Sequence, residues 1–261
     1  MSFLEAILLG LIQGVTEFLP VSSDGHLAVL ARLYGMNESA RVPFTVMLHV
    51  ATALAMIVFF MPVMVRLIGG LWAADPARRK QSWQMVLFIL LASIPAALVG
   101  YKLGDWMESA LSTPLLLGLM FIVTGAIVFG TRYARGGGTL NWWRALLIGV
   151  AQAVGIVPSI SRSGATIAMG MYTGMDRGAA FEFSFLLAIP AILGAFVLEL
   201  HKHASELVLV RGAYLAAGML VAFVSGLAAL YVLRRAVLSR RLHWFAYYCW
   251  AAGLAVILFL R

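Results

Sequence analysis

Residues 13–27 read QGVTEFLPVSSDGHL, a polar segment around Pro20 in an otherwise apolar part of the chain. The polar members that matter are Glu17, Ser22, Ser23, Asp24 and His26. Burying a polar group in hydrocarbon without a hydrogen-bond partner is unfavourable by roughly several kcal/mol of free energy. If this part of the chain lies in a membrane, the segment is therefore expected to be the functional part of the protein.

The composition around this segment is that of an integral membrane protein. Of 261 residues, 62% are hydrophobic and 11% are charged, with a mean hydropathy of +0.95. Long apolar runs separated by basic loops favour helices over the short alternating strands of an outer-membrane barrel. The net charge of +8 comes largely from loop arginines, which indicates orientation in a bilayer and no nucleic-acid partner. The single cysteine, Cys249, excludes an intrachain disulfide.

Six apolar segments are long enough to cross a membrane, since a spanning helix needs about 20 residues. They are approximately residues 46–66, 83–103, 114–132, 181–200, 213–233 and 243–260.

Two further apolar segments are interrupted by proline and polar residues. Residues 2–34 are broken at Pro20, and residues 142–174 are broken at Pro158 and the following SISRSG. Each half is roughly 15 residues, too short for an ordinary span. We therefore expect two re-entrant helical hairpins; two tilted complete spans per segment are the alternative. The predicted fold is an all-α polytopic membrane protein, a single membrane domain of six spanning helices and two hairpins.

The basic residues predict the orientation of this domain. Eleven of them fall in one set of loops: Arg66, Arg78, Arg79, Lys80, Arg132, Arg135, Arg144, Arg234, Arg235, Arg240 and Arg241. Six fall in the opposite set: Arg32, Arg41, Lys102, Lys202, Arg211 and Arg261. The richer set is expected to be cytoplasmic, which places both termini outside.

The two broken segments resemble each other when the sequence is shifted by 139 positions. Eleven residues are identical to their partners without a gap: Gly10, Gln13, Val15, Ser22, Gly25, Gly35, Met36, Ala40, Phe44, Leu48 and Leu54. Both polar interruptions fall in register. Each copy holds one hairpin and three spans, and three is odd, so the second copy is inverted in the membrane. The pattern predicts an inverted repeat of residues 1–135 and 139–261, joined by glycines 136–138.

The breaks are suited to binding an anion. Ser22 or Ser23 is expected to cap the helix after the first break, and Ser161 or Ser163 the helix after the second. A helix start offers free N–H groups and a partial positive charge. Arg162 adds a fork of donors that fits phosphate, and an arginine at membrane depth needs an anionic partner.

The first break also carries groups that can move protons. Gln13 and Glu17 are four residues apart and share a helical face. His26 is close enough in sequence to reach the hydroxyl of either serine, and a serine, a histidine and a carboxylate together activate a nucleophile. The alternative for Arg162 is an internal ion pair with Glu17 or Asp176.

Other polar residues have weaker claims to a function. Asp24 could be a first-turn helix carboxylate, a metal ligand or a surface group at the mouth of the site. His49 lies early in a span and is expected to be a packing or capping residue. His201 and His203 are two residues apart at the end of a span, a poor spacing for two ligands.

These two segments resemble the signatures of the undecaprenyl-diphosphate phosphatase family, the bacitracin-resistance proteins. QGVTEFLPVSSDGH resembles the first signature and PSISRSGAT, residues 158–166, the second. The resemblance implies Glu17, Ser23, His26 and Arg162 as catalytic residues. It implies a supporting, substrate-binding set of Gln13, Ser22, Ser161, Ser163 and Thr166. Ser159 stands where the family usually has glycine, and Asp24 where serine or threonine is expected.

The same resemblance implies an activity. The family converts undecaprenyl diphosphate to undecaprenyl phosphate, recycling the lipid carrier of cell-wall synthesis, and needs a divalent cation such as Mg²⁺ or Ca²⁺. Glu17 is the expected metal ligand. We expect a multi-pass protein of the bacterial inner membrane whose site opens outside, acting on a polyprenyl diphosphate and able to form a homodimer.

Two mechanisms and one competing function remain open at this stage. Either Ser23 attacks the terminal phosphorus while His26 handles the proton, or Glu17 and the metal activate a water and Ser23 only binds. The competing function is a lipid-phosphate or small-anion transporter, because inverted repeats with broken helices also suit alternating access.

Overall fold

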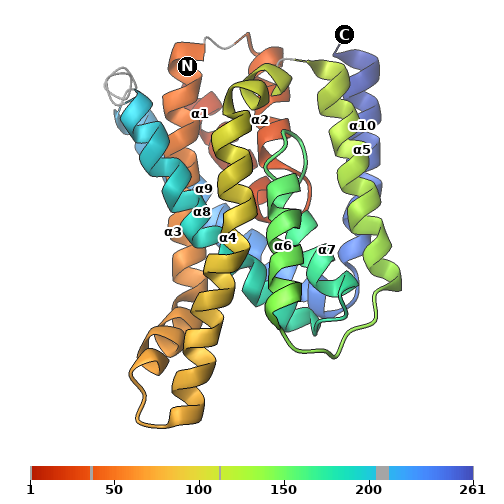
Figure 1. The fold of residues 1–261 in the computed structure, drawn as a ribbon. Helices are drawn as coiled ribbons and strands as arrows, with labels where there is room; N and C mark the ends of the chain where they lie inside the picture. Colours follow the sequence, from red (N-terminus) through yellow and green to blue (C-terminus); the bar gives the residue numbers. More distant parts are fainter. Residues whose placement is uncertain (1, 36–37, 112, 204–211, 261) are drawn as a thin grey trace.

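A computed structural model describes residues 2–35, 38–111, 113–203 and 212–260. Over these residues the protein is helical, without a β-strand, and its termini lie at the same end (Figure 1). The helices are α1 (Phe3–Phe18), α2 (Ser23–Leu33), α3 (Glu38–Leu71), α4 (Pro76–Leu111), α5 (Pro114–Gly130), α6 (Trp142–Val154), α7 (Arg162–Tyr172), α8 (Arg177–His203), α9 (Gly212–Leu238) and α10 (Phe245–Phe259). Short 3₁₀ helices, Thr131–Tyr133 and Leu242–Trp244, follow α5 and precede α10.

Six helices are long and apolar enough to cross a membrane, which confirms the six predicted spans. The candidate spans are Phe44–Leu71, Pro76–Lys102, Pro114–Tyr133, Arg177–Gly194, Gly212–Leu238 and Leu242–Phe259. The α3–α4 pair is longer than predicted and projects beyond the other helices (Figure 1). α4 begins before its apolar segment because the Asp75 carboxylate accepts the N–H groups of Ala77 and Arg78. This cap starts the helix in the polar sequence that precedes the predicted span.

The two broken segments each form two short helices, α1–α2 and α6–α7. Within each pair the helices contact each other, and each pair also packs against a helix from the other half of the chain. α1 lies against α9 and α6 against α4. Glycine permits both approaches, because a Cβ at Gly10 would meet the carbonyl oxygen of Gly218 and a Cβ at Gly149 that of Ala92.

An aromatic cluster fixes the end of α1 in the protein core. Phe18 is fully buried, and its ring lies 5.9 Å from that of Phe185 in α8. Phe60 and Phe181 complete the cluster, with ring centroids 5.3 Å and 4.9 Å from Phe185. Since Phe18 follows Glu17 directly, this packing holds the carboxylate-bearing turn in place.

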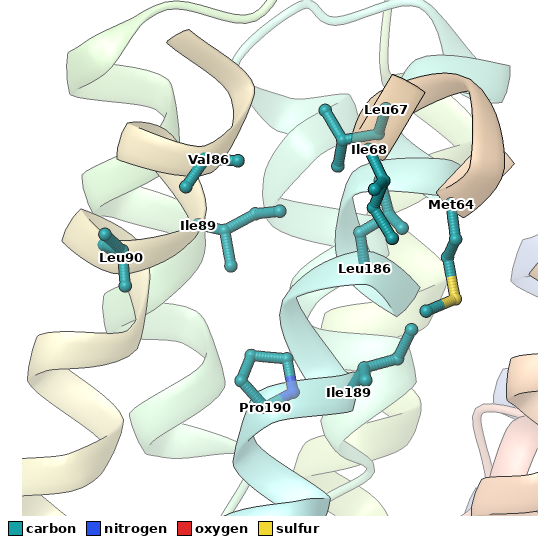
Figure 2. A pocket seen from close by; sticks show the side chains of 9 residues that line it. All are labelled: Met64, Leu67, Ile68, Val86, Ile89, Leu90, Leu186, Ile189 and Pro190. Atoms are coloured by element: carbon teal, nitrogen blue, oxygen red, sulfur yellow. The ribbon is translucent and has the colours of Figure 1, made fainter. Parts of the chain in front are cut away.

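A shallow apolar groove lies on the surface between α3, α4 and α8 (Figure 2). Its volume is about 190 Å³, and its lining includes Met64, Leu67, Ile89, Ile189 and Pro190. None of the predicted site residues lines it.

Candidate active site

The first break brings Gln13, Glu17 and Ser23 into contact. The Ser23 hydroxyl donates to Glu17 Oε2 over 2.7 Å, and Gln13 Nε2 donates to the same oxygen over 3.1 Å. Gln13 and Glu17 are buried, as the four-residue spacing on α1 predicts. The hydroxyl of Ser23 therefore points at a carboxylate, the group that can take its proton.

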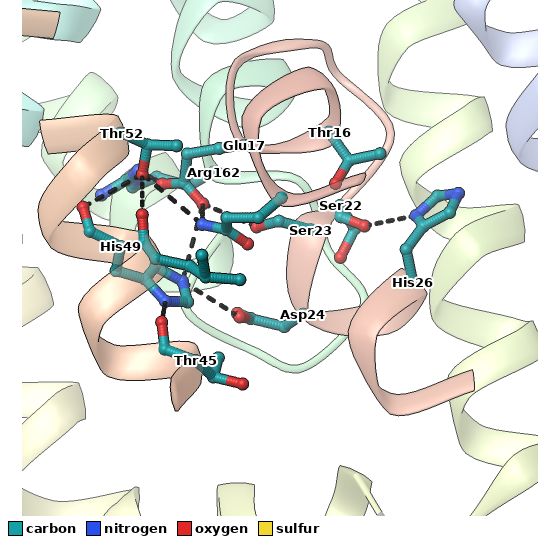
Figure 3. Close-up of polar contacts among 12 residues, drawn as sticks. Thr16, Glu17, Ser22, Ser23, Asp24, His26, Thr45, His49, Thr52 and Arg162 are labelled. Carbon is teal, nitrogen blue, oxygen red and sulfur yellow. Dashed lines mark hydrogen bonds and ion pairs between the residues drawn. The ribbon is translucent and has the colours of Figure 1, made fainter. Parts of the chain in front are cut away.

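The second break contributes Arg162 to the same carboxylate. Arg162 Nη2 lies 2.5 Å from Glu17 Oε1, so the first residue of α7 pairs with the end of α1 (Figure 3). This is the ion pair that the sequence left open as an alternative for Arg162. The two breaks, far apart in the chain, meet at one point in space.

Helix starts lie at both breaks and are capped in the same way. Ser22 is the N-cap of α2 and accepts the N–H of Gly25, while Ser161 is the N-cap of α7 and accepts the N–H of Gly164. These two caps occupy matching positions in the 139-residue register. Free N–H groups and helix dipoles at two starts favour negative charge between them.

Both breaks contain a residue in the left-handed region that favours glycine. Ser22 has φ 68° and Ser159 has φ 63°. The φ of Ser159 is one that glycine adopts without strain, and glycine is the residue that the resemblance leads us to expect at this position. Ser159 is fully buried, and its hydroxyl has no hydrogen-bond partner among the described residues.

Thr124 of α5 holds the second break, a role that the sequence did not reveal. Its hydroxyl donates to the carbonyl of Ser159 and accepts the N–H of Ser161, both over 3.1 Å. Thr124 is buried in a helix that is otherwise apolar at this depth. A lone buried threonine in an apolar span was the only available signal.

The side chains of three predicted substrate-binding residues form hydrogen bonds at the start of α7. Ser161 and Ser163 hydroxyls lie 3.2 Å apart, and Thr166 donates to the carbonyls of Arg162 and Ser163. All three side chains are buried. In this arrangement their hydroxyls are bonded within the start of α7 and help to shape it.

His26 faces α10 and not the serine hydroxyls. Its Nδ1 lies 2.6 Å from the Ser22 carbonyl oxygen and its Nε2 lies 2.6 Å from the Tyr248 hydroxyl. A carbonyl only accepts, so Nδ1 carries a proton, and in the neutral ring the Tyr248 hydroxyl donates to Nε2. The ring also packs edge-on against Phe121. The structure thus separates His26 from the contact between Ser23 and Glu17.

His49 joins the cluster, so the expectation of a packing or capping residue is wrong. Its Nε2 lies 3.6 Å from Glu17 Oε2 and 3.5 Å from Asp24 Oδ1 (Figure 3). Asp24 sits in the first turn of α2 with its side chain 55% exposed. Asp176, the other acid considered for Arg162, caps α8 through the N–H of Ala179. The side chains of His201 and His203 lie outside the described residues.

A family model and curated relatives match this chain over nearly all of its length. The model described as bacitracin resistance protein BacA matches residues 6–255. The chain belongs to this family. It is 39% identical over 257 residues to an undecaprenyl-diphosphatase of Syntrophotalea carbinolica, covering 97% of both chains. It is 39% identical over 273 residues to the one of Desulfatibacillum aliphaticivorans, with 98% of both covered. For Methanococcus maripaludis the identity is 34% over 261 residues, with 98% of this chain and 100% of that one covered.

For this BacA-family member, Glu17 is the residue expected to hold a divalent cation. Within the described residues there is no group of three or more His, Cys, Asp or Glu placed to bind a metal ion. Glu17 supplies one carboxylate, and its oxygens already accept from Ser23, Gln13 and Arg162. Mg²⁺ is commonly bound by one or two carboxylates together with substrate phosphates, which is the arrangement that these residues fit.

The site combines a hydroxyl, a carboxylate and a guanidinium in direct contact. Ser23 and Glu17 can exchange a proton directly, and Arg162 can neutralise charge on a phosphate. The two capped helix starts add backbone donors nearby. This set of groups is suited to phosphoryl transfer, in which positioning and charge stabilisation carry most of the catalysis.

Proposed function

We propose that this protein hydrolyses undecaprenyl diphosphate to undecaprenyl phosphate and phosphate, recycling the lipid carrier of cell-wall synthesis and conferring bacitracin resistance. The observation that carries the proposal is the meeting of Ser23, Glu17 and Arg162 where the two breaks touch. Membership of the BacA family and the names of the relatives support the substrate. The transporter alternative has no comparable support.

The proposed reaction begins with Ser23. Its Oγ attacks the terminal phosphorus, its proton passes to Glu17 Oε2, and the bond to the bridging oxygen breaks. Glu17 then gives the proton to the leaving undecaprenyl phosphate. Arg162 and the helix starts of α2 and α7 hold the charge that develops on the terminal phosphate oxygens.

Water completes the reaction by attacking the phosphoserine. Glu17 takes a proton from this water and returns it to Ser23 Oγ as phosphate leaves. In the rival version Glu17 activates water directly and Ser23 only binds the phosphate. Rapid quenching with labelled substrate distinguishes them: the first version predicts labelled phosphoserine at position 23, and its repeated absence supports the second.

We assign His26 a supporting role in this scheme. With Nε2 engaged by Tyr248 and Nδ1 by the Ser22 carbonyl, it holds the start of α2, where Ser22 and Ser23 lie. Glu17 would hold a divalent cation, which would supply further charge neutralisation. Gln13 keeps the Glu17 carboxylate oriented.

We further propose the inverted repeat and the two re-entrant hairpins. Three observations support them: the matching caps at Ser22 and Ser161, the two short helix pairs, and the reciprocal packing of α1 on α9 and α6 on α4. The proposed halves are residues 1–135 and 139–261. The basic turns after α3, α5 and α9 lie at the end opposite the termini, as an inverted arrangement requires (Figure 1).

The proposed location is the bacterial inner membrane, with the basic end cytoplasmic and the site opening outside. Cysteine scanning tests this orientation, because Cys249 is the only native cysteine and is buried. In a Cys249→Ala background, a cysteine at Trp72 is expected to be protected from an impermeant thiol reagent in intact cells, and one at Phe259 to be labelled. The predicted homodimer is tested by the mass of the purified protein in detergent.

The function itself is tested by phosphate release from undecaprenyl diphosphate in detergent, with Mg²⁺, with Ca²⁺ and after chelation. We expect cation-dependent release by the wild type and a loss of at least about 100-fold in Arg162→Ala. Arg66→Ala, an exposed arginine on the projecting part of α3, is the matched control and should retain activity. Folded wild-type protein that releases no phosphate under any cation would refute the phosphatase and favour the transporter.

A further inference from the structure

Asp24 and His49 face each other at the edge of the site. Asp24 belongs to α2 and His49 to α3, and Nε2 of the ring lies 3.5 Å from Asp24 Oδ1. The same Nε2 lies 3.6 Å from Glu17 Oε2, while Nδ1 lies 2.9 Å from the carbonyl oxygen of Thr45 (Figure 3). One imidazole therefore bridges two carboxylates and is held from behind by the backbone of its own helix.

The partners of this ring indicate its charge. The Thr45 carbonyl can only accept, so Nδ1 carries a proton, and Nε2 lies at ion-pair distance from two carboxylates. Two carboxylates beside one imidazole favour its positively charged form. Glu17 has a second cation, Arg162, whereas His49 makes the one ion pair found for Asp24 in the described part of the chain.

Asp24 is placed where an anionic substrate must come close to it. It follows Ser23 directly, and it is the exposed member of a cluster in which Glu17 is buried. A bare carboxylate here would repel a diphosphate, because charges a few ångströms apart interact strongly in a partly dehydrated site. The cluster Glu17, Asp24, Arg162 and His49 is neutral overall when the ring is charged.

We propose that His49 is a positioning residue that neutralises Asp24, and so allows a diphosphate to reach Ser23. The inference rests on the proposed function, and it adds a residue from α3 to a site otherwise built from the two breaks. The proposal makes a specific claim: the His49 ring aids substrate binding only because the Asp24 carboxylate is present. A ring that merely packed α3 against α2 would matter equally with or without that carboxylate.

The test compares His49→Ala, Asp24→Asn and the double variant, each as purified full-length protein in detergent. Two quantities are measured: KM for undecaprenyl diphosphate, and Kd for inorganic diphosphate from its effect on the thermal unfolding midpoint. We expect His49→Ala to raise both about tenfold. The double variant is expected to return both to within about twofold of wild type, because the uncompensated charge is gone. Asp24→Asn alone should stay within about twofold.

His243→Ala, in the 3₁₀ helix before α10, is the matched control and should leave both constants unchanged. A double variant as impaired as His49→Ala overturns the inference, as does a His49→Ala protein that binds like wild type. If His49→Ala does not fold, His49→Gln replaces it, since it keeps an N–H donor without the charge. A wild type that binds inorganic diphosphate but releases no phosphate from undecaprenyl diphosphate refutes the proposed function, and the Kd values still decide the role of His49.

Discussion

The hairpins α1–α2 and α6–α7 share a plan but carry different chemistry. Each has a buried glutamine, Gln13 or Gln152, a capping serine and a helix start. When the sequence is shifted by 139 positions, Glu17 aligns with Ile156 and Ser23 aligns with Arg162. The first hairpin therefore holds the carboxylate and the hydroxyl that we propose as base and nucleophile, and the second holds the guanidinium.

In the proposed repeat, the two helix pairs share a scaffold and differ in the reactive groups that they carry. The caps and the close glycine contacts that build the scaffold are present in both hairpins. The reactive groups are present in one only, so the scaffold does not require them. Placing opposite charges on opposite hairpins also lets each neutralise the other before substrate arrives, since Glu17 and Arg162 pair directly.

The largest expected effect concerns the nucleophile. Ser23→Ala should lower kcat for phosphate release by at least about 10³-fold, because no other hydroxyl lies on the Glu17 carboxylate among the described residues. Ser163→Ala in the second hairpin should cost less than about tenfold, since its hydroxyl contacts Ser161. Similar losses in the two variants would show that the chemistry is not confined to the first hairpin.

The two buried glutamines sharpen the comparison next. Gln13→Leu should lower activity about tenfold, because Glu17 loses a hydrogen bond that orients it. Neither polar atom of the Gln152 side chain has a hydrogen-bond partner within the described ranges, so Gln152→Leu should keep the wild-type unfolding midpoint or raise it. Both variants are assayed for phosphate release and thermal unfolding. A destabilised Gln152→Leu would mean that Gln152 has an essential partner.

The capping serines test whether the hairpins are equivalent as scaffolds. Ser22→Ala and Ser161→Ala each remove one N-cap hydrogen bond, and each should lower the free energy of unfolding by about 1 kcal/mol. The measurement is detergent-solubilised thermal unfolding. Glycine at Ser161 should cost only a few tenths of a kcal/mol. Glycine at Ser22 should cost less, because it adopts φ 68° without backbone strain. A large difference between the two alanine variants would argue against matched roles.

The smallest expected effect is a gain in stability at the second break. Ser159→Gly should raise the free energy of unfolding by about 0.5–1 kcal/mol, because glycine adopts φ 63° without strain and the buried unpartnered hydroxyl is removed. Ser159→Ala is the control, as it removes the hydroxyl and keeps the backbone strain. If alanine stabilises as much as glycine, the gain comes from the hydroxyl alone.

The sequence predicted the parts of the site that depend on short-range spacing. Six spans followed from apolar run length, and the contact of Gln13 with Glu17 followed from their four-residue spacing. The proximity of Arg162 followed from the register of the two breaks.

Residues brought in by packing between helices were not predictable in the same way. His49 and Thr124 come from spans that carry no motif, and helical periodicity does not say which neighbour a span will face. His26 illustrates the same limit, because its spacing from the serines did not determine whether its side chain points toward them or toward another helix. Its direction is determined by Tyr248, more than two hundred residues later in the chain.

The contact of α1 with α9 has a consequence for biogenesis. The surface that receives Gly10 includes Gly218, and the cation that pairs with Glu17 is Arg162. A ribosome makes the first hairpin long before either of these residues. The first hairpin therefore cannot complete its native contacts during its own synthesis. It is made early in translation, but its packing surface and its ion pair become possible only after α7 and α9 have been made.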